Sequence, residues 1–511
     1  MESPRAFVNG RIYALDPATG RYLRHDEMVV AGGRIAAVGR GLAGAGVERI
    51  DLGGKTVLPA FADSHLHLTD TGWFLGERNL GQVRGYAEFE HRVHGLPAGE
   101  TVFAGQYDDA RWDDEREADA RPLDAAFPER LAMLVRVDAH SCLVNRSTLA
   151  WLDLPPGLEG IERDAEGLPT GRLFLDANWR AQTIFMAALP ERDRRAAERR
   201  ALEEALRQGA LHLHVQLVGR EGYEAFAHEI AGISALARDL APELAGKLHW
   251  KLCTREVEIA ALLGLPYVGG DVFLDGSIGS RTAAVSEPYA DRGGNGTLFH
   301  GDEEVRAYFS AAQERGISAG VHAIGDRALE QAISAIEAAL GGAPSKRTRH
   351  FIEHAELLTP DQIARCARLG IHLSMQPQFD AVWGADGGMY ERRLGRARKR
   401  TMNRLATLVH AGVLVAGGDD SPVCRLSPLE GMEACVEHHE PEERLSPDEA
   451  LTMYTYAAAR LGHAEENTGR IAPGLAADLV VLDRDPLADG GFAATRVLET
   501  WGDGRLLFKR G

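Results

Sequence analysis

The sequence has few cysteines and no long apolar run. Its 511 residues include five cysteines, which are widely spaced and form no Cys-x-x-Cys pair. A chain of this size does not need disulfides for stability, so reduced thiols are the simplest interpretation. No apolar run reaches the length of a membrane span, and residues 1–20 lack the basic start and apolar stretch of a secretory signal. We therefore expect a soluble cytoplasmic protein.

The chain also lacks a basic stripe. Its formal net charge of -18 opposes binding to phosphate backbones and to anionic membranes. The two arginine-rich stretches cover residues 192–200 and 392–404, and in the first of them acidic residues are interleaved, as on a solvated helix face. We expect a small-molecule substrate and no nucleic-acid or membrane partner, and we leave a homodimer open.

The composition is otherwise that of a globular protein, with 45% hydrophobic and 26% charged residues. The length allows more than one domain. Residues 6–56 and 469–509 are typical of short strands separated by turns such as Asn9-Gly10. These strand-rich ends predict one small β domain formed from residues 1–57 and 468–511.

Between these ends, strands alternate with helices. The eight strand candidates cover residues 57–65, 211–217, 248–253, 267–274, 318–322, 349–354, 371–375 and 413–417. This alternation predicts a closed parallel (β/α)8 barrel of the TIM type over residues 58–467. The segment from about 69 to 190 is too long for a simple connection and contains strands of its own, so we expect an inserted α+β subdomain that is a candidate lid.

Side chains that bind metals follow several of these strands. The stretch Asp63-Ser64-His65-Leu66-His67 follows an apolar run, and residues two apart on a strand point to the same side. His322, His354 and the pair Asp419-Asp420 end three further strands. Each residue alone is readily explained as structural. The carboxyl ends of barrel strands meet at one face, however, so the set predicts a metal site.

Neutral imidazoles with a carboxylate suit Zn²⁺, with iron, manganese or cobalt as alternatives. A metal with an open coordination position lowers the pKa of bound water towards about 7. Hydrolysis then needs a carboxylate that takes up the proton and passes it to a leaving nitrogen. Asp420 is our candidate for this general base, Asp419 is its near rival, and a turn-capping role is the alternative for either.

These strand ends resemble the amidohydrolase superfamily, and further segments resemble its YtcJ-like branch, the amidohydrolase 3 type. The segments are Leu274-Asp-Gly-Ser-Ile-Gly-Ser-Arg-Thr-Ala-Ala284, Val321-His-Ala-Ile-Gly-Asp-Arg327, Ile352-Glu-His-Ala355, Met375-Gln-Pro377 and Gly474-Leu-Ala-Ala-Asp-Leu-Val-Val-Leu482. The likeness runs from about residue 5 to the C-terminus. It implies a distorted (β/α)8 barrel with a composite β-sandwich domain, one or two divalent metals, and hydrolysis of a carbon–nitrogen bond. It also implies that His65, His67, His322 and His354 are metal ligands and that Asp420 is both ligand and base.

Asp271 departs from the pattern of this family. The family usually has a lysine at this position, and its carbamate bridges two metals. An aspartate is shorter, so direct ligation by Asp271 stays open, and one metal is as compatible with the sequence as two. We expect structural roles for Lys251, on the preceding strand, and for His212 and His214.

Four further residues are candidates for substrate binding. Arg281 and Ser277 lie in the loop that follows the strand of Asp271, and a guanidinium is well suited to a carboxylate or carbonyl oxygen. His140, in the inserted segment, resembles a family position near the substrate. Gln376 follows a neighbouring strand and is expected to line the cleft.

The sequence therefore predicts a metal-dependent amidohydrolase that cleaves a non-peptide amide bond of a small molecule, such as an N-substituted formamide or N-acyl compound. In this hypothesis metal-activated water attacks the carbonyl and Asp420 is the general base. A deaminase, or a hydrolase of cyclic imides or ureas, is the alternative on the same scaffold. A catalytically reduced, metal-dependent binding protein is the alternative from another class. The physiological substrate is not encoded in any transferable pattern.

Overall fold

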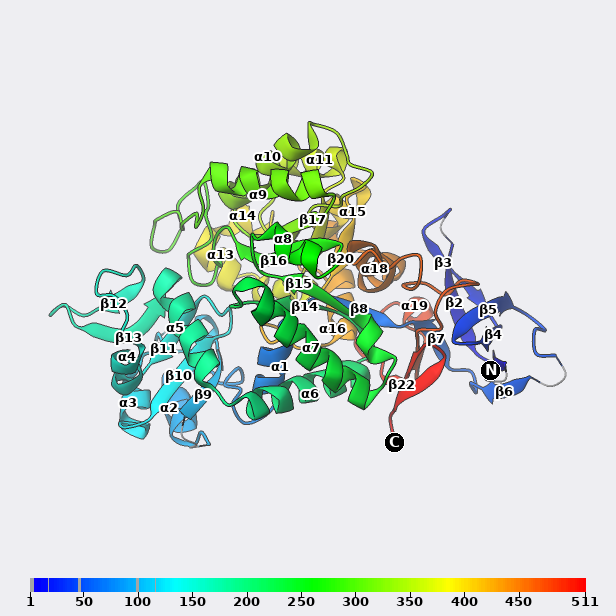
Figure 1. Ribbon diagram of the computed structural model, residues 1–511, viewed down its shortest axis with the longest axis horizontal. Helices are drawn as coiled ribbons and strands as arrows, with labels where there is room; N and C mark the ends of the chain where they lie inside the picture. The colour runs from blue at the N-terminus through cyan, green and yellow to red at the C-terminus, as the bar shows by residue number, and fades with distance from the viewer. Residues whose placement is uncertain (1–3, 17, 45–46, 98–100, 115) are drawn as a thin grey trace.

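The computed structural model describes residues 4–16, 18–44, 47–97, 101–114 and 116–511. The middle of the chain forms two parallel sheets with the strand orders β15-β14-β8 and β16-β17-β18-β19-β20 (Figure 1). Their strands are β8 (Phe61–Leu66), β14 (Ala210–Leu217), β15 (Leu248–Leu252), β16 (Tyr267–Phe273), β17 (Ser318–Ala323), β18 (Phe351–His354), β19 (His372–Met375) and β20 (Val415–Gly417). The strands follow one another in chain order within these sheets.

The strands are parallel because helices connect them. Every residue of β8 and β14 is buried, as in strands that are covered on both faces. The long connecting helices are α6 (Glu191–Arg207), α7 (Gly222–Leu240), α9 (Asp302–Arg315), α10 (Asp326–Leu340) and α11 (Pro360–Leu369), and they lie outside the strands in Figure 1. Local sequence fixes their ends: Thr359 caps the start of α11 by accepting a bond from Gln362, and Gly370 ends it at φ 66°.

The first and last strands of this region meet at their carboxyl ends. The Asp420 amide donates to the His65 carbonyl at 2.9 Å, and the His67 amide donates to the Ser421 carbonyl at 3.0 Å. Between β15 and β16 the described residues form no hydrogen-bonded ladder. The fold is thus mixed α/β, and closure into one continuous barrel sheet stays a prediction.

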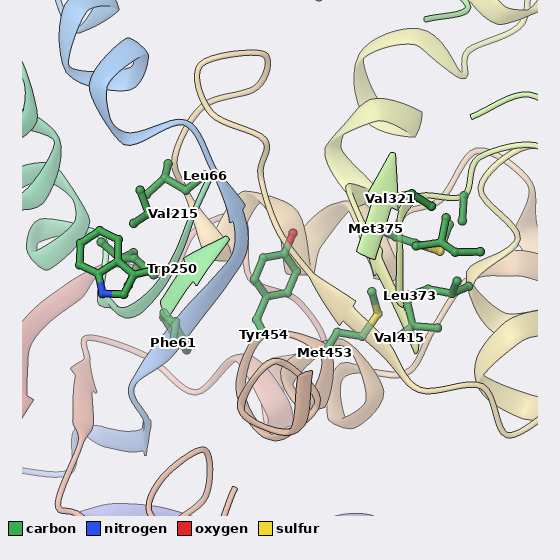
Figure 2. Close-up of a cluster of buried hydrophobic side chains, with 14 of the residues drawn as sticks. Phe61, Leu66, Val215, Trp250, Val321, Leu373, Met375, Val415, Met453 and Tyr454 are labelled. Carbon is green, nitrogen blue, oxygen red and sulfur yellow. The ribbon is translucent and has the colours of Figure 1, made fainter. Parts of the chain in front are cut away.

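A hydrophobic cluster fills the space between the two parallel sheets. Figure 2 shows side chains from β8, β14 and β15 on one side and from β17, β19 and β20 on the other, with Tyr454 between them. Tyr454 belongs to a π-helical turn, η4 (Met453–Ala457), that joins α17 (Pro447–Thr452) to α18 (Ala458–Leu461). Its hydroxyl donates to Asp419 Oδ1 at 3.2 Å, so this turn supports the segment that carries Asp420.

The two ends of the chain form one mixed sheet, with parallel and antiparallel strand pairs, in the order β23-β22-β21-β7-β2-β3. A second sheet has the order β5-β4-β1-β6. The strands are β1 (Arg5–Val8), β2 (Arg11–Asp16), β3 (Arg21–His25), β4 (Glu27–Ala31), β5 (Arg34–Gly39), β6 (Glu48–Asp51), β7 (Thr56–Pro59), β21 (Leu479–Leu482), β22 (Val497–Gly502) and β23 (Arg505–Lys509). Phe7 and Met28 of one sheet and Leu479 and Trp501 of the other lie in one hydrophobic cluster.

A five-stranded sheet lies between β8 and β14 in the chain. Its order is β12-β13-β11-β10-β9, and its members are β9 (Thr101–Tyr107), β10 (Leu131–Arg136), β11 (Ser141–Val144), β12 (Ile161–Arg163) and β13 (Pro169–Phe174). Helix α5 (Leu175–Ala188) follows it and leads back to α6. The sheet has hydrophobic clusters of its own, one of them around Phe89 and Trp112.

Two further expectations concern thiols and membranes. The five cysteines are all free, as expected from their spacing. Within the described part of the chain, none of the helices is both long enough and apolar enough to pass through a bilayer.

Candidate metal centre

Four candidate ligands gather where β8, β16 and β20 end. The Nε2 atoms of His65 and His67 are 3.4 Å apart, as the two-residue spacing predicts. Asp420 Oδ1 lies 3.2 Å from His65 Nε2 and 3.1 Å from His67 Nε2. Asp271 Oδ2 lies 3.2 Å and 3.1 Å from the same two atoms. Three strands that are distant in the chain thus bring these four residues together around His65.

The second oxygen of Asp271 faces two more imidazoles. Asp271 Oδ1 lies 3.5 Å from His322 Nδ1 and 3.6 Å from His354 Nε2. The aspartate therefore lies between two groups of candidate ligands, although it is shorter than a carbamylated lysine. The backbone of β16 is irregular at this point: Gly269 and Gly270 have φ values of 88° and 121°, and the register with β17 shifts between Gly269 and Phe273.

The donor atoms fit a divalent metal. Metal–ligand distances of about 2.0–2.2 Å place tetrahedral ligand atoms about 3.3–3.6 Å apart. Two groups of these residues offer ligand atoms that all lie within 4.8 Å of one another: His65, His67 and Asp420, and His65, Asp271 and His354. Asp271 Oδ1, His322 Nδ1 and Asp420 Oδ1 are also buried without a hydrogen-bond partner, which is unusual for polar atoms in a folded protein. These residues can therefore hold a cation.

Neighbouring groups fix which nitrogen of each imidazole faces the carboxylates. His65 Nδ1 lies 2.7 Å from Glu353 Oε2, and His354 Nδ1 lies 2.8 Å from Gln376 Oε1. Both partners are acceptors, so each Nδ1 carries a proton and each Nε2 faces Asp271. Such partners orient metal-binding histidines in proteins.

Glu353 forms a buried ion pair with Lys251. Its carboxylate bonds to the ammonium of Lys251, which also donates to the Ser64 carbonyl at 2.7 Å. Burial acts to raise the pKa of Glu353, but Lys251 and His65 lower it to about 2. Lys251 is thus structural, as expected. Glu353 was missed, although a glutamate inside the apolar run before His354 is a signal for a buried partner.

The charges of the site favour a cation. Burial acts to raise the pKa values of Asp271 and Asp420, but the facing imidazoles hold both pKa values well below the usual range. Burial acts to lower the pKa of His67, but its contacts with these two carboxylates raise that pKa to about 10. Two ionised carboxylates therefore stabilise positive charge here, and protons compete with a metal for the same atoms.

Asp419, the rival of Asp420, faces away from this cluster. It accepts bonds from the Gln378 side chain at 2.9 Å and from the Ser427 amide at 2.6 Å. Burial and the neighbouring Asp63 raise the pKa of Asp419 well above its usual value. Asp420, in contrast, lines the cavity described below.

The histidines of β14 also lie elsewhere. His212 Nε2 is 2.9 Å from Asp478 Oδ2, and the ring of His214 packs against His249 with centroids 4.6 Å apart. A residue of β14 that does contribute was missed: Gln216, whose side-chain oxygen accepts a bond from the Asp271 amide at 3.2 Å. Its place at the end of a barrel strand was the available signal.

A cavity of about 170 Å³ opens onto the candidate ligands. Its walls include two of the four predicted substrate residues, His140 and Ser277. The Ser277 hydroxyl donates to Asp138 Oδ2 at 2.7 Å, and the His140 ring lies 5.4 Å from the ring of His322.

The other two predicted substrate residues are engaged outside the cavity wall. Arg281 Nη2 pairs with Asp291 Oδ2 at 2.7 Å, and the Gln376 amide holds His354. Neither residue lines the cavity. We therefore assign no substrate contact to Arg281 or Gln376.

Comparisons with known proteins agree with this chemistry. The chain is 30% identical to the putative amidohydrolase YtcJ of Bacillus subtilis over 86% of both chains. It is 28% identical to the N-substituted formamide deformylase of Arthrobacter pascens, over 94% of this chain and 95% of that protein. An uncharacterized metal-dependent hydrolase from Pyrococcus horikoshii has a similar structure, with a TM-score of 0.74, 27% identity and coverage of 95% of this chain and 98% of the other. A model described as "Amidohydrolase family" matches residues 48–508, and the chain therefore belongs to the amidohydrolase family of metal-dependent hydrolases.

Proposed function

We propose that this protein hydrolyses a non-peptide carbon–nitrogen bond, the amide of a small molecule such as an N-substituted formamide or N-acyl compound. The observation that carries the proposal is the position of Asp420, a buried carboxylate that faces two imidazoles and lines the cavity. The likeness to an N-substituted formamide deformylase over nearly the whole chain supports the choice of bond.

The candidate ligands form two groups that share His65. His65, His67 and Asp420 form one, His65, Asp271 and His354 form the other, and His322 Nδ1 lies 3.5 Å from Asp271 Oδ1. Zn²⁺ suits these nitrogen and oxygen donors. When bound, such metals polarise a carbonyl and activate water. We propose that these residues would hold two divalent metal ions, with Asp271 as a ligand in place of the lysine that the family usually has.

Asp420 moves the proton in this proposal. Its carboxylate is ionised at neutral pH because the imidazoles hold its pKa low. It takes a proton from the attacking water and delivers it to the departing nitrogen, so that one amide and one water give one carboxylic acid and one amine. Glu353 and Gln376 keep the imidazoles oriented throughout.

The test is hydrolysis of a panel of amides by metal-loaded protein and by Asp420→Asn. We expect the variant to lose activity by about 10²–10⁴-fold, the usual contribution of a general acid–base group. The metal content of the Asp420→Asn sample is measured as well. If the variant retains its metal, the loss of activity is due to the loss of proton transfer. A fully active Asp420→Asn would refute the assigned role.

The products separate the alternatives. Amine and carboxylate indicate an amidase, ammonia indicates a deaminase, and ring opening indicates a cyclic imide or urea hydrolase. Metal-loaded protein that binds ligands tightly without turning any of them over would identify a binding protein instead.

A further inference from the structure

Part of the cavity wall is apolar and aromatic. It is built from segments that are far apart in the chain, including β9, α5, β16 and α12 (Pro377–Trp383). The phenylalanine and tryptophan residues that line it are Phe74, Phe103, Trp179, Phe273, Phe379 and Trp383. Such a wall offers flat, uncharged surfaces to whatever lies beside the reacting bond.

Two of these side chains form a rigid pair across the fold. The rings of Trp179, on α5, and Phe273, at the end of β16, stack with centroids 4.5 Å apart and an interplanar angle of 18°. Phe273 also contacts the ring of His322 edge-on at 4.8 Å. The stack therefore links the inserted segment directly to a candidate ligand, and it fixes one side of the cavity.

Both arginines among the described cavity-lining residues already have carboxylate partners. Arg136 pairs with three aspartates, Asp108 at 2.9 Å, Asp109 at 3.0 Å and Asp138 at 2.8 Å. Arg220 faces Glu229 at 3.5 Å, and Glu229 also faces Arg194 at 3.7 Å and Arg195 at 3.4 Å. Among the described residues that line the cavity, six carboxylates stand against these two arginines, so a substrate carboxylate would meet an excess of acidic groups, and burying an unpaired charge is costly.

The size of the cavity admits one aromatic ring. Its volume of about 170 Å³ is close to the roughly 150 Å³ of an apolar cavity that accommodates benzene. A substrate with one ring therefore fits beside the candidate ligands.

We propose that the substrate is an uncharged amide carrying one apolar group about the size of a single aromatic ring, and that amides with a carboxylate next to the bond are rejected. This inference rests on the proposed function and specifies its substrate class. The excess of carboxylates over arginines in the cavity wall accounts for the rejection, and the Trp179–Phe273 stack accounts for the preference for a ring.

Three formamides test the role of charge. N-formyl-2-phenylethylamine and N-formylphenylalanine differ only by a carboxylate, and N-formylphenylalaninamide replaces that carboxylate by a neutral group of similar size. We expect kcat/KM for the carboxylate compound to be at least about 100-fold below that of the first compound, with the neutral amide near the first. Equal or better hydrolysis of the carboxylate compound would overturn the inference and leave the proposed function intact. No amide hydrolysis at all would overturn both.

Variants test which residues are responsible. Trp179→Ala should lower kcat/KM for N-formyl-2-phenylethylamine by about tenfold more than for N-methylformamide, which has no ring. Trp151→Ala is the matched control, because Trp151 lies on α4 (Arg146–Leu152) of the same segment, is 41% exposed and is absent from the cavity wall. Equal losses on both substrates in Trp179→Ala would contradict the role of the stack.

A gain of function completes the test. Met186 lines the cavity, is partly buried and is unbranched, so Met186→Lys adds a positive charge with little change of shape. We expect it to raise kcat/KM for N-formylphenylalanine relative to the neutral amide by about fivefold. An unchanged ratio would contradict the charge of the wall as the cause. If the wild-type protein prefers N-formylphenylalanine and Arg220→Gln abolishes this preference, Arg220 forms an anion site and the inference is overturned.

Discussion

The ion pair of Lys251 and Glu353 connects the stability of the fold to the metal centre. Lys251 Nζ and Glu353 Oε1 are bonded in the interior, and their side chains are 1% and 0% exposed. Removing one partner of a buried pair leaves an uncompensated charge, which costs about 3–5 kcal/mol. Lys251→Met and Glu353→Gln are therefore each expected to lower the free energy of unfolding by this amount.

The double variant separates two roles. With both charges removed, no buried charge is left unpaired, so Lys251→Met/Glu353→Gln should regain most of the stability lost by either single variant. It should not regain metal affinity, because the carboxylate that accepts the proton of His65 Nδ1 is still missing. Loss of such a partner typically lowers metal affinity about 10–100-fold.

Urea unfolding of metal-free protein and metal titration of folded protein measure the two effects. Wild-type protein, both single variants and the double variant form one cycle. Additive losses of stability in the double variant would refute the claim that the two charges compensate each other. Wild-type metal affinity in Glu353→Gln would refute the orienting role of Glu353.

Two further perturbations test the fold around the site. Gly269→Ala should lower the free energy of unfolding by about 3 kcal/mol or more, because its Cβ would lie 2.1 Å from the Gly320 carbonyl oxygen at a φ of +88°. The control is Gly264→Ala, which should lower it by only about 1 kcal/mol, because Gly264 has a φ of +67° and nothing within 4 Å of its Cβ position. Equal losses of stability in urea unfolding would contradict the steric argument. Acid should destabilise the protein through His249 and His372: burial, with nearby cations, lowers both pKa values from 6.5 to about 3. Since the unfolded chain takes up these protons first, the stability from the neutral rings is complete above about pH 6.5 and falls by about 2–3 kcal/mol per residue at pH 4.5. A double glutamine variant should lose less stability than wild type between pH 7 and 4.5, and an identical loss would contradict this assignment.

Much of the strand framework was predictable, because buried strands carry continuous apolar runs. The predicted bounds of β4, residues 27–31, match those of the structure. The two-residue spacing of His65 and His67 predicted that their rings lie close together, as they do. Residues 469–483 were expected to contain short strands and turns, and they contain the short strand β21. Only β21 is regular, since the preceding residues bond irregularly to the edge of β5, for example through Ile35 and Leu475 at 2.9 Å.

The side-chain network of the site was less predictable. Strand ends identify which residues meet, but not what each one binds. Gln376 was expected to face substrate and instead accepts the proton of His354 Nδ1, and Arg281 was engaged by an aspartate ten residues along the chain. The reach of Asp271 depends on the irregular backbone at Gly269 and Gly270, which side-chain length alone does not reveal.

Metal analysis of purified protein tests the central claim most directly. Wild-type protein loaded with Zn²⁺, without added bicarbonate, should contain two metal atoms per chain, because Asp271 takes the place of the family's lysine and needs no carbamylation. Asp271→Ala should contain one or none. A wild-type value near one would contradict the second metal ion, and a value near zero would contradict the metal centre itself.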